Sequence, residues 1–165
     1  MAAAQAWHGA MMTLSLRILV DADACPVKEE IYRVAYRTEV PVVIVSNAHL
    51  RVPAHPLLSR VVVDDGFDAA DDWIAAQAEA AALVVTADIL LADRCLKVGA
   101  GAVIAPTGRP FTTASIGNAV AVRAIMSDLR AGGDRIGGPA PFSKEDRSRF
   151  LSALDAAIVR VRRQL

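Results

Sequence analysis

The sequence has few cysteines, few aromatic residues and no long apolar segment. Two of its 165 residues are cysteines, Cys25 and Cys95. That is too few for a disulfide framework and favours thiols in a reducing cytoplasm. No segment reaches the ~18 uninterrupted apolar residues of a membrane-spanning helix. Residues 1–12 lack the basic and apolar regions of a signal peptide. These absences predict a soluble, cytoplasmic protein with no membrane partner.

The chain also has no net charge. Its 18 Lys and Arg residues balance its 18 Asp and Glu residues, so any binding of nucleic acid requires a local basic patch. Basic residues gather late in the chain, at Arg123, Arg130, Arg135, Arg147, Arg149, Arg160, Arg162 and Arg163. The acidic residues between them favour a solvated helix face, and contact with phosphates is the alternative. The three histidines match no zinc motif.

The length and composition are those of one globular domain. A chain of 165 residues falls within the range of a single domain, and 54% hydrophobic residues argue against disorder. We assign residues 1–14 to an irregular N-terminal extension. Residues 15–165 form the single domain, which ends in a C-terminal helix.

Short apolar runs alternate with segments of helical pattern along this domain. We predict strands at residues 16–20, 41–45, 61–63, 83–85 and 102–104, with a loop at 51–60. We predict helices at 26–37, 68–82, 89–98 and 113–130, and a last helix from about 144. Continuous apolar strands are typical of a parallel sheet that is buried on both faces. The sequence therefore predicts a three-layer α/β fold, with a mostly parallel five-stranded sheet and helices on both faces.

The last helix has a clear start and one apolar face. Ser143 and Asp146 have the spacing of a capping box. The apolar face consists of Phe150, Leu151, Leu154, Ile158 and Val161. This face can pack on the sheet or on a second subunit, so a homodimer is one expectation.

The most informative segment lies at the end of the first predicted strand. An apolar run stops at Asp21 and Asp23, and Pro26 then begins a helix. In an open α/β sheet, ligands bind beyond the carboxyl ends of the strands. Two carboxylates at that position suit a hard divalent cation such as Mg²⁺. The alternative is that both aspartates only end a strand and cap a helix.

Further acidic residues follow the other predicted strands. They are Asp64, Asp65, Asp68, Asp71 and Asp72 after the third strand, and Asp88 and Asp93 after the fourth. Parallel strands would bring these residues to one edge of the sheet. Clustered carboxylates repel one another unless a cation compensates, so we predict a Mg²⁺ or Mn²⁺ site suited to phosphoryl chemistry. For Asp68, Asp71 and Asp72, a favourable interaction with the helix dipole is an equally good explanation.

Polar residues near the same strand ends are candidates for binding a phosphate group. Ser46, Asn47 and Arg51 follow the second strand, Thr86 follows the fourth and Arg109 follows the fifth. Lys28, in the first helix, can bind a phosphate or pair with a carboxylate. Each of these residues has a structural role as its alternative.

Several motifs together resemble the YaiI/YqxD family of bacterial proteins. They are DADACPVK at 21–28, SN at 46–47, LRVP at 50–53, GFDAAD at 66–71 and TADILLA at 86–92. Three short motifs follow late in the chain: GGP at 137–139, FS at 142–143 and DR at 146–147. The resemblance covers roughly residues 16–165, and the motifs occur in the right order.

The resemblance implies a fold similar to PIN-like nuclease domains, which carry an acidic metal site at the strand ends. By that resemblance, Asp21 would be the acid of the first strand. Asp88 would be the acid of a Thr-x-Asp motif, with Thr86 as its partner. Asp68 and Asp71 would supply the middle acids, and which of them is the ligand stays open. Asp23, Asp72 and Asp93 are further candidates for the metal site.

Three functions are consistent with these residues. The first is a metal-dependent hydrolase of RNA or DNA phosphodiesters that uses Asp21, Asp88 and one of Asp68 or Asp71. The second is a non-catalytic module that binds RNA or protein and keeps a residual acidic site. The third is a phosphatase of the haloacid dehalogenase type with Asp21 as nucleophile, although the order of its motifs along the chain differs.

Overall fold

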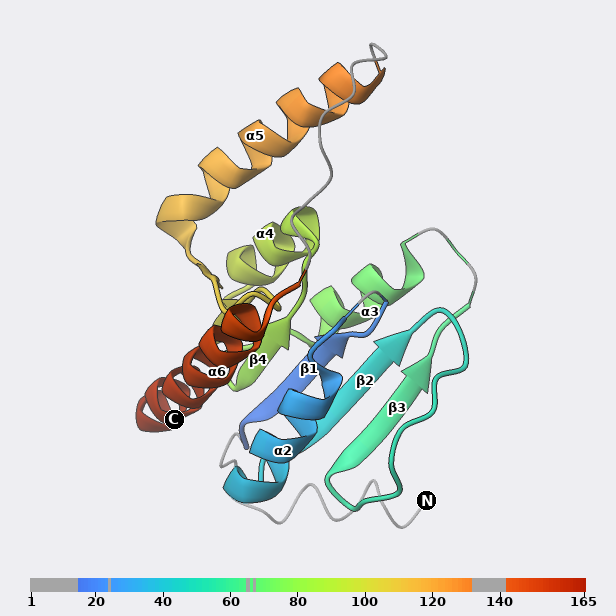
Figure 1. Ribbon diagram of the computed structural model, residues 1–165, viewed down its shortest axis with the longest axis vertical. Helices are drawn as coiled ribbons and strands as arrows, with labels where there is room; N and C mark the ends of the chain where they lie inside the picture. Colours follow the sequence, from blue (N-terminus) through green and yellow to red (C-terminus); the bar gives the residue numbers. More distant parts are fainter. Residues whose placement is uncertain (1–14, 24, 65, 67, 132–141) are drawn as a thin grey trace.

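The computed structural model describes residues 15–23, 25–64, 66, 68–131 and 142–165. The predicted N-terminal extension, residues 1–14, lies outside this range. Within the described residues, six strands form one sheet in the order β3-β2-β1-β4-β5-β6 (Figure 1). Their bounds are β1 Arg17–Asp21, β2 Val42–Ser46, β3 Leu58–Val62, β4 Ala82–Val85, β5 Ala102–Ile104 and β6 Pro110–Phe111. The first five strands pair in parallel, which confirms the predicted α/β class.

The prediction of five strands was wrong, because a short sixth strand pairs antiparallel with β5. The chain reverses through a turn in which Gly108 has a positive φ of 87° and its N–H donates to the carbonyl oxygen of Ala105. Pro110 has no N–H to donate, and it is tolerated because β6 lies at the edge of the sheet. A two-residue strand that contains proline leaves no recognisable pattern in the sequence.

The other edge strand, β3, starts earlier than predicted. It spans Leu58–Val62, so the loop predicted for residues 51–60 was wrong at its end. Ser59 and Arg60 are exposed because β3 has a partner only on the side of β2. Because these residues are polar, β3 lacks the continuous apolar run by which buried parallel strands are recognised.

Five helices connect or flank the strands within the described residues. They are α2 Lys28–Thr38, α3 Ala69–Gln77, α4 Ile89–Lys97, α5 Thr113–Ala131 and α6 Lys144–Gln164. Helix α3 is shorter than the predicted 68–82, because Ala78 is extended and Ala82 already pairs with Arg17 in the sheet. None of the described helices combines the length and the apolar character needed to cross a membrane.

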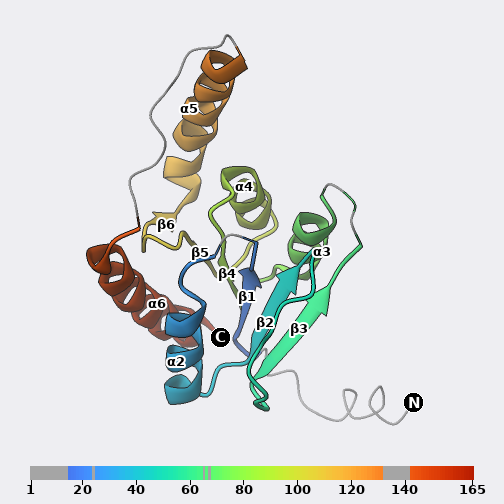
Figure 2. The ribbon, with the colours of Figure 1, turned by 45° about the vertical axis from the view of Figure 1, so that its right-hand side comes forward.

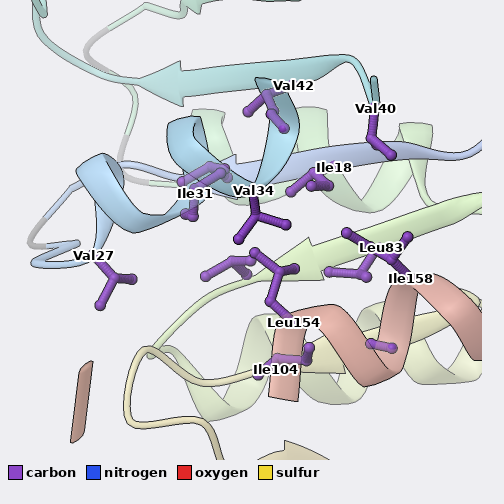
Figure 3. Packing of buried hydrophobic residues seen from close by; sticks show 14 of the residues in the cluster. Ile18, Val27, Ile31, Val34, Val40, Val42, Leu83, Ile104, Leu154 and Ile158 are labelled. Atoms are coloured by element: carbon purple, nitrogen blue, oxygen red, sulfur yellow. The ribbon is translucent and has the colours of Figure 1, made fainter. Parts of the chain in front are cut away.

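The apolar core lies on both faces of the sheet, with successive residues of β1 pointing to opposite sides. Ile18 and Val20 pack with residues of α2 and α6, and Leu19 packs with residues of α3 and α4. Figure 2 shows α2 and α6 on one face of the sheet and α3 and α4 on the other. Figure 3 shows Leu154 and Ile158 of α6 against Leu83 and Ile18 of the sheet. The predicted apolar face of α6 therefore packs inside this chain. The capping box of Ser143 and Asp146 is also confirmed.

Candidate functional site

A cleft lies where β1, β2 and β4 end. Asp21 is the last residue of β1, Asn47 follows β2 and Asp88 follows β4. The cleft has a volume of about 540 Å³. Its lining consists of Asp21, Asp23, Asn47, Ala70, Asp71, Ala87, Asp88, Ile89 and Arg123. Strands β1 and β4 are neighbours in the sheet, so the topology brings together acids that are 67 residues apart in sequence.

Thr86 holds Asp21 and Asp88 in place through two hydrogen bonds. It is buried, with 1% of its surface exposed. Its hydroxyl donates to Oδ2 of Asp21 at 2.8 Å and accepts from the backbone N–H of Asp88 at 3.0 Å. Thr86 is therefore a positioning residue here, and the phosphate contact predicted for it would require an atom that already has two partners.

Asp88 caps helix α4 as well as lining the cleft. Its Oδ1 accepts hydrogen bonds from the backbone N–H groups of Leu90 and Leu91, at 2.9 and 3.3 Å. Asp residues favour this position because they satisfy the free N–H groups of a first helical turn. The cap fixes the direction of the carboxylate and leaves Oδ2 available to a ligand.

The carboxylates of the cleft destabilise one another's charged forms. Burial raises the pKa of Asp21, the hydrogen bond from Thr86 lowers it in part, and the charges of Asp23 and Asp88 raise it further. Burial also raises the pKa of Asp71 to about 6, together with the charges of Asp88 and Asp21. Such shifts indicate negative charge that is not fully compensated.

The pKa of Asp71 leads to a prediction about stability. The folded chain binds this proton more tightly than an unfolded chain, whose carboxyl has a pKa near 3.8. The contribution of Asp71 to stability therefore falls as the pH rises from about 4 to about 6. Without divalent cations, we expect Asp71→Asn to raise the melting temperature by about 2–4 °C at pH 8, and by about half as much at pH 5, where only part of this stability has been lost.

Differential scanning fluorimetry at the two pH values checks this expectation. Asp72→Asn is the matched control, because Asp72 is the next residue, is exposed and pairs with Arg94 at 2.9 Å. An equal gain for Asp71→Asn at both pH values would contradict the charge explanation.

The structure distinguishes Asp71 from the other acids near α3 and α4. Asp71 lines the cleft beside Ala70, whereas Asp68 is exposed and is not part of the lining. Asp72 pairs with Arg94, and Asp93 pairs with Lys97 at 2.8 Å. Asp71 is therefore the better candidate for the middle acid, a choice that the sequence left open.

The predicted phosphate-binding residues do not all come together. Asn47 lines the cleft, and its Oδ1 is buried without a hydrogen-bond partner among the described residues. Lys28 instead donates to the carbonyl oxygen of Cys25 at 3.0 Å. Arg51 and Arg109 are exposed and outside the lining. Ser46 is buried and donates to the carbonyl oxygen of Ala48.

Arg123 of α5 is a functional candidate that the sequence did not single out. It is the one basic side chain in the lining of the cleft among the residues that the structure describes. Its only signal in the sequence is membership of the late basic group. Its position follows from where α5 lies against α4, which residue spacing within α5 does not encode.

The donor set of the cleft fits a hard divalent cation. Asp21, Asp71 and Asp88 offer carboxylate oxygens, which are the ligands that Mg²⁺ prefers, and Mg²⁺ usually keeps several waters. Across the described ranges, no three acidic, His or Cys side chains are close enough to hold one ion directly between them. A cation here would be held through one or two carboxylates and water.

Comparison with known proteins finds a matching family model and several close relatives. The model of the family described as "Uncharacterized BCR, YaiI/YqxD family" matches residues 19–160. A UPF0178 protein of Sphingopyxis alaskensis is 72% identical over 149 residues, covering 90% of this chain and 96% of that protein. UPF0178 proteins of Nitrobacter winogradskyi and Rhodopseudomonas palustris are 58% and 57% identical, each over 90% of this chain and over 94% and 90% of those proteins. No solved structure matches the chain.

Proposed function

The chain belongs to the YaiI/YqxD family, and from that premise we propose that it is a divalent-metal-dependent hydrolase of RNA or DNA phosphodiesters. One observation carries the proposal. Acids from three separate segments, Asp21, Asp71 and Asp88, line one cleft that also contains a basic side chain, Arg123. A mostly parallel sheet with acids at its carboxyl edge is also what a PIN-like nuclease domain requires.

We assign a role to five residues of the cleft. Asp21 and Asp88 would hold the cation through the oxygens that Thr86 and the α4 cap leave available. Asp71 would add a third carboxylate to the cleft, from α3. When bound, Mg²⁺ or Mn²⁺ would supply an activated water and offset charge on the phosphate. The side-chain amide of Asn47 and the guanidinium of Arg123 would bind phosphate oxygens.

The first experiment is a Mn²⁺ titration by calorimetry, followed by cleavage assays. The assays use end-labelled single-stranded RNA, single-stranded DNA and duplexes, in Mn²⁺, in Mg²⁺ and in EDTA. We expect saturable Mn²⁺ binding and cleavage that EDTA abolishes. A folded protein that binds no Mn²⁺ at millimolar concentration would overturn the proposal.

A non-catalytic binding module is the second candidate. It is favoured by the absence, among the described residues, of three ligands close enough to hold one ion between them. For such a module we expect oligonucleotide binding in EDTA and no cleavage in any metal.

The placement of Asp64 argues against a phosphatase of the haloacid dehalogenase type. Asp64 follows β3, and β2 separates that strand from β1. Two strands span about 10 Å, so Asp64 is too far from Asp21 to share a small cation with it. A phosphatase would need a second acid on a strand next to β1.

Arg123 gives a prediction that separates phosphate binding from metal binding. We expect Arg123→Gln to raise the KM for an oligonucleotide by about tenfold, because a charge-assisted hydrogen bond to a phosphate contributes about 1.5–3 kcal/mol. The Mn²⁺ affinity should stay equal or rise, since a positive charge leaves the cleft.

Steady-state kinetics and calorimetry measure the two effects. Arg109→Gln is the matched control, because Arg109 is exposed and outside the lining. A drop in kcat with an unchanged KM would contradict phosphate binding by Arg123.

A further inference from the structure

Arg147, on the first turns of α6, contacts the segment that carries two acids of the cleft. Its Nη1 donates to the carbonyl oxygen of Pro26 at 2.8 Å and to Oε1 of Glu30 at 3.1 Å. Its guanidinium carbon lies 5.0 Å from the centre of the Phe142 ring. One side chain of α6 is therefore attached to the start of α2 by two hydrogen bonds, and the Phe142 ring just before α6 packs against the same guanidinium.

The partner carboxylate of Arg147 is almost completely buried. Glu30 exposes 7% of its surface, and its Oε2 has no hydrogen-bond partner among the described residues. Buried charges require a partner, because their loss of hydration is costly. Arg147 is the residue that compensates this charge, and the need for compensation fixes where its guanidinium lies.

The carbonyl that Arg147 binds belongs to the connection between β1 and α2. This connection, residues 22, 23 and 25–27 of the described chain, starts directly after Asp21 and includes Asp23 of the cleft lining. On the sheet side, the N–H of Ala22 donates to the carbonyl oxygen of Val45 at 2.9 Å. The connection is thus held at one end by β2 and at the other by Arg147.

We propose that Arg147 is a positioning residue of the acidic site: by binding the Pro26 carbonyl, it holds the β1–α2 connection and with it Asp23 and Asp21. This inference rests on the proposed function, because it assigns Arg147 a role toward the cation of that cleft. Arg147 does not line the cleft and is not a catalytic residue. Groups that orient metal ligands from outside typically change metal affinity by ~10–100-fold when they are removed.

The chain offers a matched control at the other end of the same two helices. Arg162, also on α6, donates to the carbonyl oxygen of Thr38 at 2.6 Å, and Thr38 is the last residue of α2. Arg147 therefore attaches α6 to a backbone carbonyl just before α2, and Arg162 attaches it to one at the end of α2. Figure 2 shows the two helices side by side. Arg162 does so at the end away from the β1–α2 connection.

The experiment removes the Pro26 contact without leaving a buried charge unpaired. Glu30→Gln keeps Arg147 and its bond to Pro26, whereas Glu30→Gln with Arg147→Met loses that bond. We expect the Mn²⁺ dissociation constant of the double variant to be about tenfold higher than that of Glu30→Gln. Arg162→Met should change it less than about twofold relative to the wild type.

A second measurement needs no metal. In hydrogen–deuterium exchange without divalent cations, peptides covering residues 20–28 should exchange several-fold faster in the double variant than in Glu30→Gln. Exchange there should be unchanged in Arg162→Met. This readout reports local opening of the connection, and a general loss of stability would not raise exchange in this segment selectively.

The outcomes separate the inference from the proposed function. If the wild type binds no Mn²⁺, the proposed function fails and the inference fails with it. If the wild type binds Mn²⁺ and the double variant matches Glu30→Gln in affinity and exchange, the inference alone is overturned. Equal effects of the double variant and Arg162→Met would also overturn it, since they would show a general effect of α6 docking.

Discussion

The double variant Asp21→Asn/Asp88→Asn should lose saturable Mn²⁺ binding and at least about 10³-fold of any metal-dependent cleavage. The cation is expected to lower the barrier by several kcal/mol, and each 1.4 kcal/mol corresponds to a factor of ten. Amide groups are weak ligands for hard cations compared with carboxylates. Calorimetry measures the first loss and single-turnover cleavage measures the second.

The structure indicates that this variant keeps its fold. An Asn at position 21 can still accept the hydrogen bond from Thr86, and it removes a charge whose pKa is already raised by burial. An Asn at position 88 can still cap α4, because Asn and Asp are comparable caps. A loss of function in Asp21→Asn/Asp88→Asn would therefore reflect the chemistry of the carboxylates.

The control variant removes two negative charges nearby but outside the cleft. In Asp72→Asn/Asp93→Asn, the lost ion pairs are with Arg94 and Lys97 on the surface, and such pairs contribute little to stability. We expect its Mn²⁺ affinity and cleavage to stay within about threefold of the wild type. Equal losses in both double variants would mean that net charge, rather than the site, binds the cation. Full cleavage by Asp21→Asn/Asp88→Asn would place the chemistry elsewhere.

Gly108→Ala should lower the free energy of unfolding by more than about 4 kcal/mol or prevent folding. Gly108 has a φ of +87°, which L side chains rarely adopt. A Cβ there would lie 2.6 Å from the carbonyl carbon of Arg149 and 2.8 Å from the backbone nitrogen of Phe150. These atoms belong to α6, and they cannot retreat without displacing Phe150, which is fully buried.

Gly99→Ala isolates the backbone contribution to this effect. Gly99 has nearly the same φ, +86°, but no atom lies within 4 Å of a Cβ added to it. Its substitution should therefore cost only the left-handed backbone energy, about 1–2 kcal/mol. Chemical denaturation of both variants measures the difference. If Gly108→Ala were as mild as Gly99→Ala, the close approach of α6 to the β5–β6 turn would be contradicted.

The local sequence was sufficient to predict most of the fold. Buried parallel strands such as β1 and β4 are continuous apolar runs, and the capping box of Ser143 and Asp146 marks the start of α6. The failures lie at the edges of the sheet. Strands β3 and β6 face solvent or contain proline, so their identity depends on the neighbouring strand rather than on their own residues.

The sequence by itself determined that Asp21 and Asp88 follow apolar strands, and parallel pairing then requires them to meet at one edge. The tertiary structure alone decided that Asp71 rather than Asp68 lines the cleft, because this depends on how α3 is rotated against the sheet. It also decided the places of Arg123, which lines the cleft from α5, and of Arg147, which binds the Pro26 carbonyl from α6. The position of a buried strand follows from its local apolar pattern, whereas the order of the strands and the direction of a helical side chain depend on packing between segments far apart in sequence.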